Sequence, residues 1–289
     1  MASFSFLFTP ARPGTDPRPA TGRWRTLLPP FRLLLAHRRL IWQLALHELR
    51  GRYAATLVGS LWAIVNPLVV ILVFWFVSAY GLKITFASGP PFHLVLFCGL
   101  VPWMTFGEAV SGGTSAVLNH AYLVKKIAFP LEILPVVGVV SAVIVHGFLL
   151  AVLLGILLLS GVTLTIHALQ VAYFLFALVA FTIGLVWASS ALNVFNRDVG
   201  QALGAVITIW FWMTPVVWPA QNLPPRLLHV IELNPVFYVV EGYRNALLYG
   251  RPLSAQWPLD LYFWAVTAVL LVLGSGVFRR LKPHFADVL

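Results

Sequence analysis

The chain has 289 residues, of which 60% are hydrophobic and only 10% are charged, whereas a soluble globular domain typically carries about a quarter charged residues. This composition excludes a soluble globular protein and predicts an all-α polytopic membrane protein. A net charge of +10 would suggest nucleic-acid binding in a soluble protein. Here the basic residues flank apolar runs, so they report orientation in the membrane, and no nucleic-acid partner is expected.

The first 56 residues precede the apolar runs. Residues 1–30 contain six prolines among scattered arginines and glycines, a composition that cannot form a packed core, so they are predicted to be a disordered cytoplasmic tail. Residues 31–56 interleave apolar residues such as Leu34 and Leu44 with Arg38, Glu48 and Arg50. This pattern predicts an interfacial amphipathic helix, or a pair of helices, that rests on the membrane surface.

Six apolar runs follow, each long enough to cross about 30 Å of hydrocarbon. They span residues 57–82, 92–110, 133–159, 168–194, 199–218 and 259–278. We therefore predict a six-span transmembrane domain over residues 57–280 and a C-terminal segment, 281–289. With the N-terminus inside, fifteen of the nineteen Lys and Arg residues fall on the cytoplasmic side, and only Lys83, Arg226, Arg244 and Arg251 lie outside. This asymmetry predicts that both termini are cytoplasmic.

The short charged stretch between the second and third runs, about residues 119–130, is predicted to be a cytoplasmic coupling helix. Asn119 can cap this helix, Tyr122 and Phe129 can form its apolar side, and Lys125 and Lys126 keep it out of the hydrocarbon. Such an element lies at the membrane surface, where a soluble partner can push it. The alternative is an ordinary connecting loop that carries positive charge on the cytoplasmic side.

Residues 220–250 predict a second element that does not cross the membrane. The segments 223–233 and 236–248 are apolar but too short to span, and Asn234-Pro235 separates them. They predict a re-entrant helical hairpin from the outer side, which is tolerated only where protein or water shields its backbone. Glu241 and Arg244 are three residues apart, so they can pair on one helix face. The alternative is a pair of amphipathic helices lying flat on the outer leaflet.

Signatures of catalysis are missing from the sequence. A Walker-type phosphate-binding loop needs a Gly-Lys pair, and the chain has none, so it should not bind ATP by itself. A metal-dependent sugar transferase would show paired carboxylates on a cytoplasmic loop, but the aspartates stand alone. His47-Glu48 is followed by Gly51 where the second histidine of a zinc helix would stand. We expect no catalytic residue, cofactor or metal in this chain.

A few polar and aromatic residues within the runs are candidates for function. Glu108 and His146 are expected to make polar contacts between helices or to face a wet lumen. Trp75, Tyr80 and Trp210 lie partly inside the runs, so they are candidate channel-lining residues on which the flat C–H faces of a glycan can rest. The alternative for these rings is helix packing and lipid contact.

Residues 50–67, RGRYAATLVGSLWAIVNP, resemble the start of the first span in permeases of type-2 ABC exporters, particularly those that export O-antigen and teichoic-acid chains. Further similarities follow in the same order. Residues 99–103 (GLVPW) resemble the second span of that family, 119–130 its coupling helix, and 193–198 (NVFNRD) the loop after its fourth span. Residues 214–215, 233–235 and 241–244 resemble its outer gate. The extension before residue 31 departs from the family pattern.

The resemblance implies an assembly and roles for individual residues. It implies a homodimer of six-span subunits with two separate ATPase subunits, which bind the ATP and Mg. Arg197 and Asp198 would form a contact with the ATPase in addition to the coupling helix; otherwise they are a surface pair. The outer gate would comprise the residues Pro215, Asn234, Pro235, Glu241 and Arg244. Without the resemblance, Pro215 is a simple helix kink.

The functional hypothesis is the membrane subunit of an ATP-driven exporter in the bacterial inner membrane. It would move a lipid-linked polysaccharide, O-antigen-like or teichoic-acid-like, from the cytoplasmic to the outer face, in contact with membrane lipids. One alternative is a drug or small-lipid exporter of the same fold. The other, a membrane-integral glycan-synthesising enzyme, is weaker because paired carboxylates are missing from the sequence.

Overall fold

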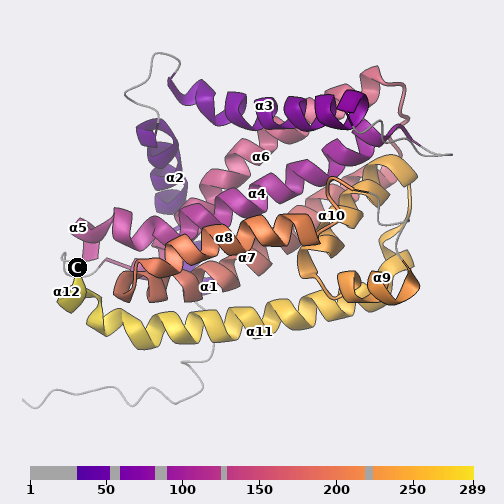
Figure 1. Cartoon of the computed structure of the whole chain (residues 1–289). Coiled ribbons are helices and arrows are strands. Elements are labelled where there is room, and N and C mark those ends of the chain that lie inside the picture. The colour runs from indigo at the N-terminus through magenta and orange to yellow at the C-terminus, as the bar shows by residue number, and fades with distance from the viewer. Residues whose placement is uncertain (1–30, 53–58, 82–89, 125–128, 219–223) are drawn as a thin grey trace, which may run out of the picture.

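The computed structural model describes residues 31–52, 59–81, 90–124, 129–218 and 224–289, and all regular elements within these ranges are helices. The predicted tail, the predicted coupling residues Lys125 and Lys126, and residues 220–223 of the predicted hairpin lie outside the described residues. In Figure 1 the long helices run in the same general direction. Helices α5 (Ala121–Val124) and α12 (Phe285–Val288) lie at one end, the α5 end, and α9 (Pro225–Glu232) lies at the other, the α9 end.

Five helical segments of the described chain are long and apolar enough to cross a membrane. They are Trp62–Gly81, Phe92–Asn119, Leu131–Leu159, Ile166–Phe195 and Trp257–Val288. Their main helices are α3 (Trp62–Phe76), α4 (Phe92–Asn119), α6 (Leu134–Leu159), α7 (Gln170–Phe195) and α11 (Trp257–Leu281). The chain is therefore an all-helical, multi-pass membrane protein.

The fifth predicted run, 199–218, forms a shorter helix than expected. Helix α8 (Asp198–Met213) has 16 residues, which correspond to about 24 Å at 1.5 Å per residue, so it falls short of the hydrocarbon thickness. It ends because Thr214 precedes Pro215 and takes the extended conformation (φ −95°, ψ 129°) that residues before proline favour. A crossing by residues 199–218, and with it the sixth span, stays a prediction.

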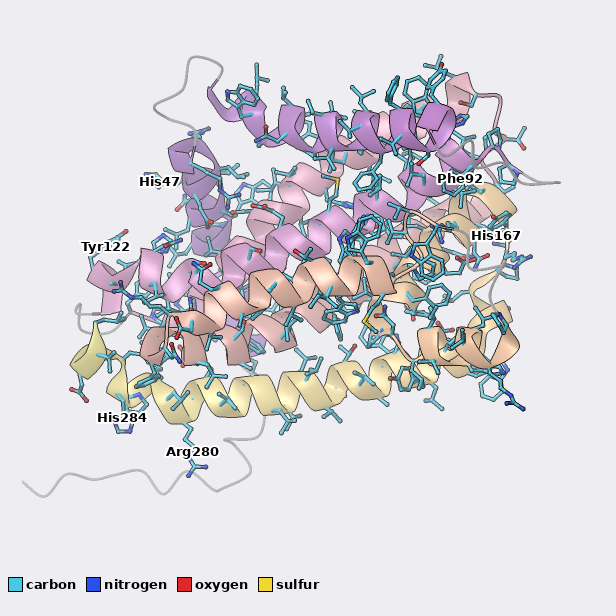
Figure 2. The ribbon with its side chains drawn as sticks, in the orientation of Figure 1. His47, Phe92, Tyr122, His167, Arg280 and His284 are labelled. Carbon is cyan, nitrogen blue, oxygen red and sulfur yellow. The ribbon has the colours of Figure 1, made fainter. Side chains whose placement is uncertain are left out.

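Helix α4 is the centre of the bundle and continues past the predicted end of its span at residue 110. In its most apolar window 78% of residues are buried, against 11% for the segment that contains α3. Figure 2 labels Phe92 near the α9 end and Tyr122 at the α5 end, so α4 runs between the two ends. Its 28 residues correspond to about 42 Å. Helix α4 therefore links the α5 end of the bundle to the α9 end.

Two pairs of long helices approach each other at glycines. A Cβ added at Gly138 of α6 would lie 2.6 Å from the backbone nitrogen of Gly113 in α4. A Cβ added at Gly274 of α11 would lie 2.0 Å from the carbonyl oxygen of Gly184 in α7. Small residues at such crossings let helix backbones touch, which is a common way of packing helices in membranes.

The predicted amphipathic segment 31–56 forms two helices, α1 (Phe31–Ala36) and α2 (Arg38–Arg52), and residues 53–56 lie outside the described part. Ile41, Ala45 and Leu49 recur every four residues and form the buried face of α2. The Ser141 hydroxyl of α6 donates a hydrogen bond to the Ala45 carbonyl (3.3 Å). Helix α2 is thus packed against the bundle at the α5 end.

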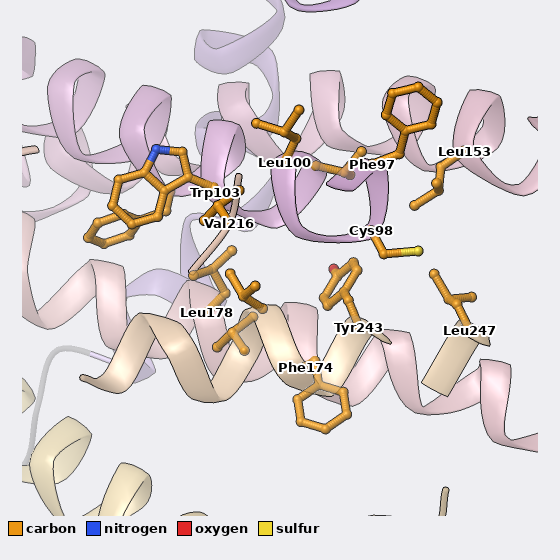
Figure 3. Close-up of a cluster of buried hydrophobic side chains, with 14 of the residues drawn as sticks. Phe97, Cys98, Leu100, Trp103, Leu153, Phe174, Leu178, Val216, Tyr243 and Leu247 are labelled. Atoms are coloured by element: carbon orange, nitrogen blue, oxygen red, sulfur yellow. The ribbon is translucent and has the colours of Figure 1, made fainter. Parts of the chain in front are cut away.

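Buried side chains form two clusters. The larger lies toward the α9 end and includes Trp103, Phe174 and Tyr243, with Cys98 among them (Figure 3). The smaller lies at the α5 end and combines Ile41 of α2 and Trp187 of α7 with residues of the C-terminal segment. The smaller cluster ties the N-terminal and C-terminal parts of the described chain to the same end of the bundle.

Candidate functional site

The predicted coupling stretch begins differently from the expected single helix. Asn119 is the last residue of α4 and is exposed, and α5 has only four residues. The His120 amide after α4 donates hydrogen bonds to the carbonyls of Ala116 and Val117 (3.2 and 3.3 Å). Tyr122 is 58% exposed and lies at the edge of the α5 end (Figure 2). A push on α5 would therefore act directly on the end of α4.

The far side of the coupling stretch is anchored in the protein. Phe129 is half-buried and packs against the cluster at the α5 end. Three residues later, the Glu132 carboxylate accepts hydrogen bonds from Lys282 Nζ (2.8 and 2.9 Å), and the Glu132 carbonyl accepts one from Trp187 Nε1 (3.0 Å). Sequence reasoning treated Lys282 only as an orientation charge. The partners are 150 positions apart in the sequence, so no local pattern marks this pair.

The loop after α7 is held by the side chain of Asn193. The buried Asn193 side chain donates to the Thr114 carbonyl of α4 (3.2 Å) and accepts from the Gly200 amide of α8 (2.9 Å). Arg197, as well as Asp198, is exposed. Arg197 shares a pocket of about 280 Å³ with Asn119. The structure therefore brings two predicted coupling positions, 119 and 197, to the same pocket.

The second half of the predicted hairpin is buried in protein. Helix α10 (Pro235–Arg244) continues into the π-helical segment Asn245–Tyr249. Most residues of α10 are buried, whereas those of α9 are mainly exposed. Pro235 occupies the first position of α10, where its missing N–H leaves no intrahelical hydrogen bond unmade. Because α10 is buried, the protein covers one side of the backbone break at Asn234-Pro235.

Asn234 connects the hairpin to the end of α8. Its side-chain oxygen accepts from the Val236 amide (3.0 Å), which caps α10, and from Trp210 Nε1 (2.8 Å). Its amide nitrogen donates to the Thr214 hydroxyl (2.8 Å), which itself donates to the Trp210 carbonyl (2.8 Å). The break between α9 and α10 is therefore hydrogen-bonded to the end of α8.

Arg244, like Asn234, makes three side-chain hydrogen bonds in the predicted outer gate. It is only 4% exposed. Its Nε donates to the Val95 carbonyl of α4 (3.2 Å), its Nη2 to the Val216 carbonyl (3.1 Å), and its Nη1 to Glu241 (3.3 Å). The Glu241 pair expected from spacing is thus present, but two backbone carbonyls hold the same guanidinium. The Val216 carbonyl lies in the irregular segment just after Pro215.

The three aromatic candidates for channel lining have different surroundings. Tyr80 is 62% exposed, and Trp75 packs edge-on against it with ring centroids 6.1 Å apart. Trp210 is half-buried and contacts the Phe106 ring at 5.2 Å. Trp75 and Trp210 are thus both half-buried against the larger cluster, whereas Tyr80 is exposed, and a lining role for the three stays a prediction.

His146 joins three helices through a buried polar chain. Its Nδ1 lies 2.8 Å from the Thr105 hydroxyl of α4 and its Nε2 lies 3.0 Å from the Tyr243 hydroxyl of α10. The Thr105 hydroxyl donates to the Val101 carbonyl (2.9 Å). Because a hydroxyl has one proton, His146 Nδ1 must donate to Thr105, and the neutral ring then accepts from Tyr243 at Nε2. This is the polar contact between helices that the sequence predicted.

No group of three or more His, Cys, Asp or Glu side chains that could hold a metal ion occurs within the described ranges. The arrangement instead consists of two anchored ends joined by α4. At the α5 end an exposed short helix follows α4 directly, and at the α9 end Arg244 bonds to its first turn. Helix α4 therefore contacts other elements at both ends of the bundle.

Comparison with known proteins identifies the family. The profile described as "ABC-2 type transporter" matches residues 39–248. The chain is 29% identical to the "O-antigen export system permease protein RfbA" of Myxococcus xanthus, over 89% of this chain and 97% of that protein. It is 25% identical to the protein of the same name from Klebsiella pneumoniae (84% and 92%) and to the "Capsule polysaccharide export inner-membrane protein CtrC" of Neisseria meningitidis (86% and 92%). The chain therefore belongs to the ABC-2 type transporter family.

Proposed function

We propose that this chain is the membrane-spanning subunit of an ATP-driven exporter that moves a lipid-linked polysaccharide, O-antigen-like or teichoic-acid-like, across the bacterial inner membrane. One observation carries the proposal: relatives named for O-antigen and capsule polysaccharide export align with 84–89% of this chain and 92–97% of their own lengths. Because the alignments cover nearly the whole of both proteins, the likeness concerns the complete permease and not one module of it.

The proposed assembly contains two copies of this chain and two ATPase subunits, which bind ATP and Mg. We place the α5 end and both termini in the cytoplasm because the basic residues of α2, Arg197 and the C-terminal segment gather there. The ATPase would dock on α5 and on Arg197 and Asp198. The exposure of Tyr122 and the pocket shared by residues 119 and 197 support this docking face.

The proposed coupling runs along α4. Displacement of α5 moves the adjoining end of α4, and the Gly113–Gly138 approach couples α4 closely to α6. At the other end, the Val95 carbonyl bonds to Arg244, so movement of α4 acts on the hairpin. In this mechanism the outer gate comprises Pro215, Asn234, Pro235, Glu241 and Arg244. The rings that line the path of the glycan are Trp75, Tyr80 and Trp210.

A substitution in the coupling stretch tests the docking face. Tyr122→Asp should weaken ATPase binding while leaving the permease folded, because the side chain is mainly exposed. Tyr122→Phe is the matched control and should keep both. Phe129→Asp should also destabilise the α5 end, since Phe129 packs against its cluster. Co-purification of the ATPase with each variant measures the effect, and full export with a retained ATPase in Tyr122→Asp would contradict the docking face.

Deletion of the gene tests the transported substrate. We expect lipid-linked glycan to accumulate inside the cell while it disappears from the surface. Drug sensitivity with normal surface glycan would instead support a drug or small-lipid exporter of the same fold. Loss of surface glycan without accumulated precursor would support a glycan-synthesising enzyme. The purified chain without its ATPase should show no ATP hydrolysis.

A further inference from the structure

A crevice of about 210 Å³, the α3 crevice, lies between α3 and the rest of the bundle. Its walls come from the end of α2, from α3, and from α4 and α6. Helix α3 lies at the edge of the bundle (Figure 1), and of its 15 described residues only Ile71 is buried. Val70 lines the crevice and is 40% exposed, so the crevice is open at the surface of the described chain.

The α3 crevice is polar at one end and apolar at the other. Arg52 of α2, Asn66 of α3 and Glu108 of α4 line it toward the α5 end. The residues that line it farther from the α5 end are apolar, and they include Val70 of α3, Met104 of α4, and Val145 and Leu149 of α6. A ligand that fits this lining has a polar group at one end and a hydrocarbon chain at the other.

The length of the first membrane segment gives the depth of the two ends. Trp62–Gly81 has 20 residues, which correspond to about 30 Å and match the hydrocarbon thickness. Trp62 therefore lies at one boundary, where tryptophan is enriched. Along the helix axis Asn66 lies about 6 Å and Val70 about 12 Å beyond Trp62. The polar end is thus close to the lipid headgroups and the apolar end lies among the acyl chains.

The charged groups at the polar end are accessible. Arg52 and Glu108 form an ion pair between α2 and α4, and their side chains are 33% and 43% exposed. A guanidinium has five N–H donors and a carboxylate has about four acceptor sites, so such a pair can bind groups of opposite charge beside it. Asn66 is also exposed, and its side-chain oxygen is an acceptor.

These charges select the headgroup of a lipid. Arg52 attracts a phosphate, whereas Glu108 repels it and attracts an ammonium group. Glu48 also pairs with Arg52, at 3.3 Å, which further disfavours a headgroup that carries only negative charge. A primary ammonium has three N–H donors for Glu108 and Asn66, and a trimethylammonium has none. The headgroup that matches the polar end is therefore phosphoethanolamine, with one charge of each sign.

We propose that the α3 crevice binds a phosphatidylethanolamine molecule from the leaflet at the α5 end. Its phosphate bonds to Arg52, its ammonium donates to Glu108 and Asn66, and one acyl chain lies along Val70 and Leu149. The lipid fills the space between α3 and its neighbours, so α3 packs against the bundle partly through it. The inference goes beyond the proposed function, because it holds whichever substrate is transported.

Retention of added lipids by the purified transporter tests the site. The chain with its ATPase is stripped of lipid in detergent. Phosphatidylethanolamine, phosphatidylcholine and phosphatidylglycerol with the same acyl chains are then added in equal amounts, and native mass spectrometry counts the molecules of each that remain bound. We expect phosphatidylethanolamine to be retained about tenfold more than phosphatidylcholine, because the choline group cannot donate to Glu108.

Three variants show whether the retained lipid lies in the α3 crevice. Glu108→Gln keeps the shape of the side chain but removes its charge, so most of the preference for phosphatidylethanolamine should disappear. Val70→Trp fills the crevice and should lower retention of this lipid about tenfold. Val69→Trp is the matched control, because Val69 is also exposed on α3 but does not line the crevice, and it should leave retention unchanged. Gel filtration with the ATPase checks that each variant is folded.

Several outcomes would overturn the site. Equal retention of the three lipids, or equal retention by Val70→Trp and Val69→Trp, would show lipid bound without a specific site in the crevice. Preferred retention of phosphatidylglycerol would contradict the role of Glu108. Displacement of phosphatidylethanolamine by an equal concentration of a polyprenyl phosphate would assign the crevice to a lipid carrier and overturn the proposal. The proposed function is tested separately by deletion of the gene, so it stands or fails independently of this site.

Discussion

Arg244 should hold the outer hairpin mainly through backbone carbonyls and not through its ion pair. Its contacts to Val95 and Val216 are buried, whereas the Glu241 side chain is 23% exposed and pairs at 3.3 Å. Arg244→Met keeps the length of the side chain but removes every donor. Hydrogen bonds from charged groups contribute about 1.5–3 kcal/mol each, and removing one partner of a buried charged network costs about 3–5 kcal/mol.

We therefore expect Arg244→Met to weaken docking of α10 by about 3 kcal/mol, which is roughly a hundredfold in the docking equilibrium. Glu241→Gln removes only the partly exposed pair and should cost at most about 1 kcal/mol. Arg244→Lys keeps the charge but cannot reach all three partners at once, so its effect should lie between these two.

The native Cys98 provides the assay for this prediction. It is buried in α4 within the cluster that contains Tyr243 (Figure 3). Undocking of α10 should expose it, so the rate of maleimide labelling should rise steeply in Arg244→Met and little in Glu241→Gln. Equal rates for these two variants would refute the reasoning, because the ion pair would then account for the docking. An unchanged rate in Arg244→Met would refute the role of the carbonyl contacts.

Other contacts lead to three shorter predictions. Gly274→Val should force α7 and α11 apart and lower the stability of the fold by about 3 kcal/mol or more. Gly276→Val, with nothing within 4 Å of its added Cβ, should change the stability by at most about 0.5 kcal/mol. The rates of thermal inactivation in detergent compare the two variants. Asn234→Leu should lower the stability of the fold by about 2–3 kcal/mol, because it removes the cap and two further hydrogen bonds. Asn234→Asp should lower it less. Trp fluorescence reports the release of Trp210 in each variant. Lys282→Glu should lower export per ATP hydrolysed, and adding Glu132→Lys should restore it; failure of the double variant to recover would argue against the pair.

Much of the architecture follows from the sequence because it depends on local properties. A run of about 20 apolar residues is stable across hydrocarbon whatever its neighbours are, so the segments that contain α3, α4, α6, α7 and α11 could be located in advance. The Asn234-Pro235 break and the Glu241–Arg244 spacing are also local, and both are present. The missing Gly-Lys pair is a property of the sequence alone.

Only the tertiary structure decided which groups meet across the fold. The Glu132–Lys282 pair joins residues 150 positions apart, and the partners of Arg244 are carbonyls, which every residue carries and no sequence pattern marks. The extension of α4 to Asn119 follows from its contacts with α6 and α7, which bury its small residues. The ion pair between Arg52 and Glu108 forms where α2 packs beside α4. Such features depend on how helices pack, because packing sets the distances between groups that periodicity and composition leave undefined.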